Sequence, residues 1–332
     1  MEAQSVDDVP AGPEWQYEPK WDGFRCLVFR DGNDVHLQSK SGQPLTRYFP
    51  EIVAAVRKIK AKAFVLDGEI VVPSDGAFSF DALLQRIHPA ATRINRLAQE
   101  TPALLIVFDL LADTDGRALT QLTLEQRRKR LEPFAARYLG SNPHLRLSPA
   151  TAKLSDAAKW LKRVGATLDG IIAKRRDVPY LPGERTGMVK IKNYRSADCV
   201  VGGFRYNEGQ KVAGSLLLGL YDHAGLLHHV GFTSTIPRKD KPALTEKLEK
   251  LIAPPGFTGN APGGPSRWST KRSAEWQPLA PTLVVEVRYD HFTGDRFRHG
   301  TTLTRWRPDK SPKQCTMDQV KQKKANLMKL LQ

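Results

Sequence analysis

The sequence has few cysteines, and they form no metal-binding or disulfide pattern. Only three occur among the 332 residues, at positions 26, 199 and 315, and none belongs to a Cys-x-x-Cys pair. This spacing excludes a cysteine-based zinc site and argues against a disulfide framework, so we expect reduced thiols in a cytoplasmic protein. The eight histidines also lack ligand spacing, and we interpret them as surface or core residues.

Long hydrophobic runs are absent as well. No apolar stretch approaches the roughly 20 residues that a membrane-spanning helix needs. The first ten residues are acidic and have no apolar core, which excludes a signal peptide. We therefore expect no membrane partner.

The composition contains no repeat and no low-complexity tract, and it is that of a globular protein. Hydrophobic residues make up 40% and charged residues 26%, and the length favours two domains. The net charge is +16, with a pI near 9.8. A positive charge of this size indicates a polyanionic partner.

One short stretch, Glu-Pro-Lys-Trp-Asp-Gly-Phe-Arg at 18–25, combines a possible nucleophile with an acid. If it is extended, Lys20 and Asp22 lie on the same face. An amine is nucleophilic only when deprotonated, and nearby cations or a metal favour that form. Alone, Lys-x-Asp-Gly is a weak signal that also fits a surface turn, so its meaning depends on the other motifs.

Two further predicted strands carry charges that need an explanation. The strand 64–72 contains Asp67 and Glu69, and a carboxylate in so apolar a strand requires a partner. Two interpretations of these carboxylates are open: a buried salt bridge, or a ligand to a metal or a ribose. In the strand 188–192, Lys190 and Lys192 point the same way. They could protect an exposed sheet edge or form a phosphate site.

The second half of the chain has a different character. Short strands are predicted at 199–205, 215–221, 227–233 and 282–289, with one helix at 245–251. About five strands with an internal helix are typical of a small barrel of the OB type. A basic amphipathic helix is predicted at 317–331.

In their order, these motifs resemble the covalent nucleotidyltransferase superfamily. Within it, the sequence is most similar to the bacterial ATP-dependent DNA ligases of the minimal two-domain type called ligase C. The matching segments are 18–25, Ser39–Gly42, Arg47–Pro50, Leu66–Glu69, Phe108-Asp109, Asp169–Lys174, Val189–Lys192, Ala197–Phe204 and Arg305–Lys310. The sequence departs from the pattern at Lys40, where many relatives have arginine, and at Asp169, where most of the superfamily has glutamate.

The resemblance implies an α+β fold. Residues 1–194 would form an ATP-grasp-like adenylation domain with antiparallel sheets and flanking helices. Residues 195–332 would form an OB-fold β-barrel that ends in the basic helix. A hinge at 193–197 would let the two domains rearrange.

The implied activity is ATP-dependent sealing of 5′-phosphate/3′-hydroxyl nicks, through a lysyl-AMP and a DNA-adenylate, in DNA repair. The resemblance implies ATP and Mg²⁺ or Mn²⁺ as cofactors, and nicked double-stranded DNA as partner, contacted by Lys321, Lys323 and Lys324. It further implies a monomer in the bacterial cytoplasm at the nucleoid, with a repair polymerase or end-binding proteins as additional partners.

The resemblance also assigns roles to individual residues. Lys20 would be the nucleophile, Asp22 would face the 3′-hydroxyl, and Lys190 and Lys192 would hold the α-phosphate. Phe108 would stack on adenine. The further nucleotide-binding residues would be Glu18, Arg25, Lys40, Glu69, Arg305, Arg307, Asp309 and Lys310. The metal ligands would be Glu69 and Asp169.

Three other functions are open at this point. An RNA ligase or a GTP-dependent capping-type nucleotidyltransferase would share the motifs and the OB domain. The Phe108–Leu111 block and the Phe-Arg pair after the lysine motif favour a DNA ligase over both. A non-catalytic nucleic-acid-binding scaffold would be expected to lack the lysine or the acids, and all are present.

Overall fold

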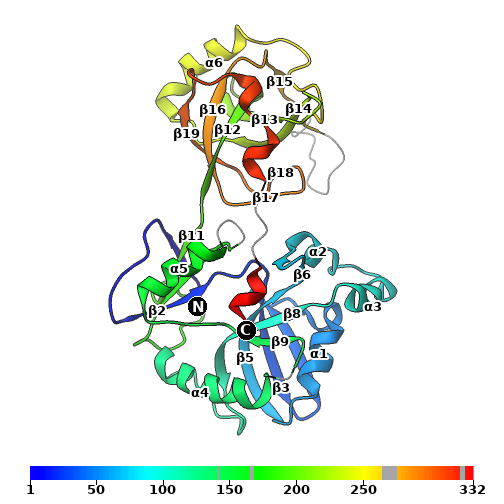
Figure 1. The fold of residues 1–332 in the computed structure, drawn as a ribbon, viewed down its shortest axis with the longest axis vertical. Coiled ribbons are helices and arrows are strands. Elements are labelled where there is room, and N and C mark those ends of the chain that lie inside the picture. The colour runs from blue at the N-terminus through cyan, green and yellow to red at the C-terminus, as the bar shows by residue number, and fades with distance from the viewer. Residues whose placement is uncertain (141, 165–167, 264–274, 322–325, 332) are drawn as a thin grey trace. The chain divides into compact units, whose positions relative to one another are not determined.

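The computed structural model describes residues 1–140, 142–164, 168–263, 275–321 and 326–331, which form two compact units (Figure 1). The first unit comprises Met1–Asn193 together with Lys323–Gln332, and the second comprises Tyr194–Gln322. Both combine helices with mainly antiparallel sheets, which confirms the predicted α+β class. Among the described residues, no helix has the length and apolar character needed to cross a membrane.

A five-stranded sheet forms the larger part of the first unit. It is antiparallel except for the last pair, and α1 (Pro50–Arg57) packs on β4 while α4 (Leu124–Tyr138) packs on β8 and β9. Buried aliphatic and aromatic side chains between the sheet and these helices form its core. In spatial order, its strands are β4 (Asp34–Ser39), β3 (Phe24–Asp31), β5 (Ala63–Val71), β8 (Leu104–Ala112) and β9 (Leu145–Leu147).

A second, four-stranded sheet completes this unit. Its spatial order is β1 (Gln4–Val6), β11 (Met188–Lys192), β10 (Gly170–Arg175) and β2 (Trp15–Pro19), with α5 (Leu154–Val164) against β2 and β10. Strand β11 pairs with β1 on one side and β10 on the other. The interpretation of Lys190 and Lys192 as guards of an exposed edge is therefore wrong.

The chain passes from one sheet to the other at Lys20–Gly23. The alternating apolar residues from Tyr17 to Gln38 predict a single hairpin, but only β3 and β4 form one, and Tyr17 lies in β2 of the other sheet. The crossing is tight: a Cβ on Gly23 would lie 2.2 Å from the carbonyl oxygen of Ile70, so only glycine fits. The segment with the proposed nucleophile thus connects the two sheets.

Short elements connect the larger ones in the first unit. Helix α2 begins at Phe80, where the Ser79 hydroxyl accepts a hydrogen bond from the backbone of Ala82. These elements are η1 (Thr46–Tyr48), β6 (Pro73–Ser74), β7 (Ala77–Phe78), α2 (Phe80–Gln85) and α3 (Ala91–Glu100).

The second unit is a curved antiparallel sheet. Its path is β14 (Leu227–Thr233), β13 (Ala213–Tyr221), β12 (Arg195–Tyr206), β16 (Val284–Tyr289) and β19 (Thr302–Trp306), with β15 (Gln277–Pro278) also on β12. The two outer strands approach each other at an isolated bridge between Thr233 and Thr301, so the path is barrel-like without closing along its full length. Its smaller elements are η3 (Arg238–Asp240), α6 (Lys241–Glu249), β17 (Phe292–Thr293), β18 (Arg296–Phe297) and η4 (Pro312–Gln314).

The end of the chain differs from the prediction. Instead of one basic helix at 317–331, the described residues form two short 3-10 turns, η5 (Met317–Val320) and η6 (Leu327–Leu330). The predicted DNA contacts Lys323 and Lys324 lie outside the described residues. Leu327 and Leu330 are buried in the core of the first unit, not of the OB domain, because their apolar side chains find partners there.

Candidate active site

A cavity of about 240 Å³ opens between the two sheets of the first unit, and it contains most of the predicted nucleotide-binding residues. Strands β2, β3, β5, β8, β10 and β11 all contribute to its wall. Asp22, Asp169 and Lys192 are not part of this lining. The predicted residues that line it are Glu18, Lys20, Arg25, Lys40, Glu69, Phe108 and Lys190.

Lys20 lies directly after β2 at the wall of the cavity. Its backbone nitrogen donates to the carbonyl oxygen of Gly170 at 2.9 Å, which fixes the segment against β10. Its ammonium forms an ion pair with the nearly buried carboxylate of Asp169. The structure therefore brings the proposed nucleophile and a proposed metal ligand into direct contact.

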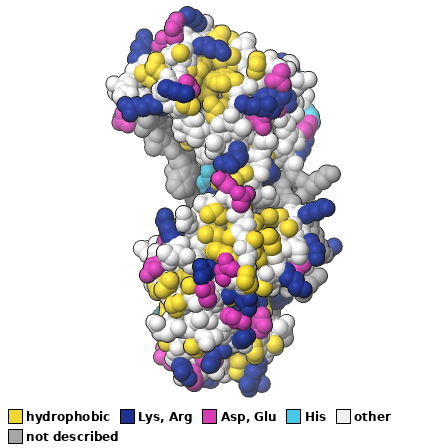
Figure 2. Space-filling model, turned by 90° about the vertical axis from the view of Figure 1, so that its left-hand side faces the viewer, with side chains coloured by type: hydrophobic (Ala, Val, Ile, Leu, Met, Phe, Trp, Pro, Cys, Tyr) yellow, Lys and Arg dark blue, Asp and Glu magenta, His cyan; other side chains and the backbone are white. Residues whose placement is uncertain are grey.

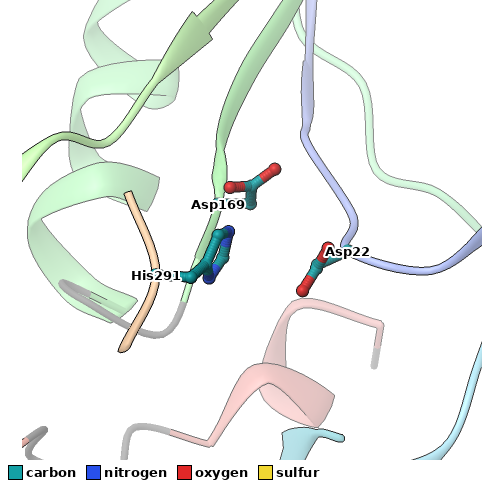
Figure 3. Close-up of side chains that lie close together, drawn as sticks. All are labelled: Asp22, Asp169 and His291. Atoms are coloured by element: carbon teal, nitrogen blue, oxygen red, sulfur yellow. The ribbon is translucent and has the colours of Figure 1, made fainter. Parts of the chain in front are cut away.

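Acidic side chains gather beside this lysine. Carboxylate oxygens of Asp22 and Asp169 lie within 4.8 Å of each other, on the segments that follow β2 and precede β10 (Figure 3). Glu69 extends from β5, and burial raises its pKa to about 8 against the opposing effect of Lys20 and Arg25. Carboxylate oxygens are the ligands that a hard cation such as Mg²⁺ prefers, so the chemistry of these three side chains suits the implied metal.

Lys190 on β11 places positive charge near Lys20, and Lys192 follows on the same strand. Burial lowers the pKa of Lys190, and the nearby charges of Lys20, Lys192 and Lys40 lower it further. Cations gathered at this density repel one another in the absence of an anion. The arrangement is therefore suited to a phosphate.

The aromatic part of the cavity is built around Phe108 on β8. The Lys174 ammonium lies 4.3 Å from the centre of the Phe108 ring and donates to Glu18 at 2.8 Å. Gln16 donates to the other oxygen of Glu18, also at 2.8 Å. Lys174 was not predicted as a site residue, although the alternation in β10 places it on the same face as the cavity residue Ile172.

Arg25, on β3, is held at the cavity wall by the buried carboxylate of Asp67. Its Nε and Nη2 atoms donate to the two carboxylate oxygens of Asp67 at 3.0 and 2.6 Å. The salt-bridge interpretation is thus confirmed for Asp67, which has no exposed surface. Tyr180, from the β10–β11 connection, also bonds to Asp67, and no sequence signal had indicated it.

Lys40 and the late basic motif have other partners in this structure. Lys40 pairs with Glu2 at 3.0 Å. In the second unit, Arg307 and Lys310 bind Asp198 at 2.9 and 2.6 Å, and Arg305 binds Glu286 at 2.7 Å. Arg307 also holds the pKa of Asp309 down at about 2. The nucleotide-binding roles of these residues remain predictions.

Two family models match this sequence. The model described as an ATP dependent DNA ligase domain matches residues 1–192, and the ATP dependent DNA ligase C terminal region matches residues 209–310. The chain belongs to the ATP-dependent DNA ligase family. Ligases of this family join DNA by forming phosphodiester bonds, and they use ATP with a divalent metal.

Individual relatives agree with this assignment. The ligase is 44% identical to DNA ligase C2 of Mycolicibacterium smegmatis, over 96% of this chain and 93% of that protein. It is 31% identical to the multifunctional non-homologous end joining DNA repair protein LigD of Mycobacterium tuberculosis, over 92% of this chain and 38% of LigD. The predicted resemblance to the minimal bacterial ligase C type is confirmed.

A solved structure supports the fold. A Lig E DNA ligase, described as binding DNA with a minimal scaffold, is similar with a TM-score of 0.56 at 14% identity, over 92% of this chain and all of that one. At this identity the similarity concerns the fold alone. The family match disfavours the RNA ligase, capping-enzyme and non-catalytic alternatives for this ligase.

Proposed function

We propose that this ligase seals nicks in duplex DNA through an AMP carried on Lys20. The observation that supports the proposal most directly is the position of Lys20 in the wall of a cavity that also holds Phe108, Glu69 and Lys190. The cavity thus combines an amine, an aromatic ring, a carboxylate and a second cation. Each of these groups suits adenylation of a lysine by ATP, because such catalysis rests on positioning and charge neutralisation.

The first step would form a bond from Lys20 to the α-phosphorus of ATP. The bond to the β-phosphate breaks, pyrophosphate leaves, and the amine gives up a proton. Lys190 and Lys192 would neutralise the charge on the α-phosphate. Phe108 would stack on adenine and Glu18 would lie at its edge, which orients the α-phosphate toward the amine.

The next two steps would transfer and then release AMP. An oxygen of the 5′-phosphate at the nick attacks the AMP phosphorus, and the bond to Lys20 breaks. The 3′-hydroxyl then attacks the 5′-phosphate, forms the phosphodiester and expels AMP. Asp22 would face the hydroxyl, and Arg25 and Lys40 would bind AMP or the nick phosphate.

Asp169 and Glu69 would hold Mg²⁺ or Mn²⁺, which when bound would neutralise phosphate charge and polarise the reacting phosphorus. Both carboxylates come from elements beside Lys20, and Asp169 already binds a cation, the lysine ammonium. A repair role, on nicks or on broken ends, is proposed because LigD, a relative named for end joining and repair, is similar over most of this chain.

The reaction can be tested with a labelled nicked duplex. Wild type with ATP and Mg²⁺ should seal the nick, and Lys20→Ala should not. Lys129→Ala is a matched control, because that side chain is 74% exposed on α4 outside the cavity. Sealing by Lys20→Ala at the wild-type rate would contradict the proposal. Efficient sealing of an RNA nick, or use of GTP, would instead favour the alternative nucleotidyltransferases.

A further inference from the structure

Tyr180 is fixed between the cavity and helix α4. Its backbone nitrogen donates to the carbonyl oxygen of Thr120 at 2.8 Å, and the Arg127 guanidinium lies 5.6 Å from the centre of its ring. Arg127 is itself fully buried and forms two bonds of 2.9 Å to Asp109. The tyrosine ring therefore has a rigid support.

The hydroxyl of Tyr180 binds both members of the Arg25–Asp67 pair. It donates to Oδ2 of Asp67 at 2.8 Å and accepts from Nη2 of Arg25 at 3.2 Å. Asp67 and Arg25 come from adjacent strands β5 and β3, whereas Tyr180 comes from the β10–β11 connection beside the other sheet. The tyrosine thus connects the two walls of the cavity.

These contacts decide which part of Arg25 remains available. Nε and Nη2 point to Asp67, and Nη2 also reaches Tyr180. Nη1 donates one hydrogen bond, to the backbone carbonyl oxygen of Met1, another residue of the cavity wall. A guanidinium held along one edge presents its remaining donors in a fixed direction. Nη1 carries two N–H groups and Met1 accepts from one of them, so the other is the donor that a ligand oxygen would meet.

We propose that Tyr180 is a positioning residue, which holds the Arg25 guanidinium so that Nη1 meets a phosphate oxygen of AMP or of the nick. The inference rests on the proposed function of this cavity. Burial raises the pKa of Tyr180, with the charge of Asp67 adding to the effect, so the hydroxyl keeps its proton and can donate throughout the neutral range.

The test is Tyr180→Phe, which removes the hydroxyl and keeps the ring. Tyr206→Phe is the matched control, because its hydroxyl also donates to a carboxylate, that of Glu249 at 2.7 Å, but in the second unit. We expect Tyr180→Phe to lower the single-turnover rate of lysyl-AMP formation or of sealing a pre-adenylated nick about tenfold. Tyr206→Phe should leave both rates unchanged.

A double-mutant cycle separates positioning from a general structural role. Arg25→Lys keeps the charge but loses the planar fork, so Tyr180→Phe should cost little more in that background. Wild-type rates in Tyr180→Phe, or fully additive losses in the double variant, would overturn the inference. If wild type itself forms no lysyl-AMP, the proposed function fails first, and the two failures are thereby distinguished.

Discussion

Lys20 and Asp169 form an ion pair in which the ammonium of the proposed nucleophile occupies the carboxylate of a proposed metal ligand. A second cation at Asp169 would compete with the ammonium and so favour the reactive amine.

This competition predicts the behaviour of two variants at Asp169. Asp169→Asn should lower the rate of lysyl-AMP formation by about tenfold or more, because an amide is a weaker ligand for a hard cation. Asp169→Glu should keep most of the rate, since a carboxylate is retained. Adenylation rates measured over a range of Mg²⁺ concentrations test this, and equal rates in wild type and Asp169→Asn would contradict it.

The raised pKa of Glu69 predicts that the Mg²⁺ requirement of adenylation depends on pH. Its raised pKa of about 8 means that the free protein binds a proton there at neutral pH, and a metal must displace it. The Mg²⁺ concentration for half-maximal adenylation should therefore fall as the pH rises toward about 8. Glu69→Gln should need more Mg²⁺ and lose this dependence. A half-maximal concentration independent of pH in wild type would show that Glu69 is not a metal ligand.

The raised pKa of Glu69 also makes the stability of the folded protein depend on pH. The pKa is higher in the folded protein than in the unfolded chain, so folding binds a proton between the two values. The contribution that protonated Glu69 makes to the free energy of unfolding is fully present below 4.5, the pKa in the unfolded chain. It is lost as the pH rises through about 8, the pKa in the folded protein. In metal-free protein, Glu69→Gln should therefore gain stability relative to wild type as the pH increases, which chemical denaturation at several pH values can measure.

The sequence predicted the site residues that belong to motifs but not the residues that hold them in place. Lys20, Glu69 and Lys190 were recognisable from short patterns and meet at one cavity. Tyr180 and Lys174 were missed, because their importance depends on side chains that only the folded sheets bring near them. Asp67 could be read as a salt-bridge partner, but its partner Arg25 follows from the pairing of β3 with β5.

Among the elements, η6 gives the clearest prediction. Leu327 is buried against the first unit, and its backbone nitrogen donates to the carbonyl oxygen of Gly76 at 2.7 Å. Leu327→Ala should lower the free energy of unfolding by about 2 kcal/mol, because a buried leucine is lost. The neighbouring Lys329→Ala, at an exposed position, is the control. Equal denaturation midpoints for the two variants would show that this turn contributes little.

Strands were predicted better than the ends of the chain. The predicted ranges of β11 and β14 match the structure residue for residue, because alternation and turn residues define them locally. The predicted helix at 317–331 was wrong, because amphipathic spacing alone cannot show that two short turns pack in different units. Strand β19, which carries Arg305, was recognised only as a motif.

For the molecule as a whole, the net charge of +16 is the feature that bears on DNA binding. Figure 2 shows lysines and arginines interspersed with acids over the visible face of each unit. Binding to nicked DNA should still weaken steeply with salt, because phosphate contacts release counterions. Lys321→Ala should reduce the slope of log Kd against log salt by about one. An unchanged slope would exclude Lys321 from the DNA contacts.

The central claim, that Lys20 carries AMP, is tested most directly by the intact mass of the purified protein. Wild type should gain one AMP on incubation with ATP and Mg²⁺ and lose it with pyrophosphate, whereas Lys20→Ala should gain nothing. Protein that already carries the adduct must first be stripped with pyrophosphate. No gain by stripped wild type, or an equal gain by Lys20→Ala, would contradict the account.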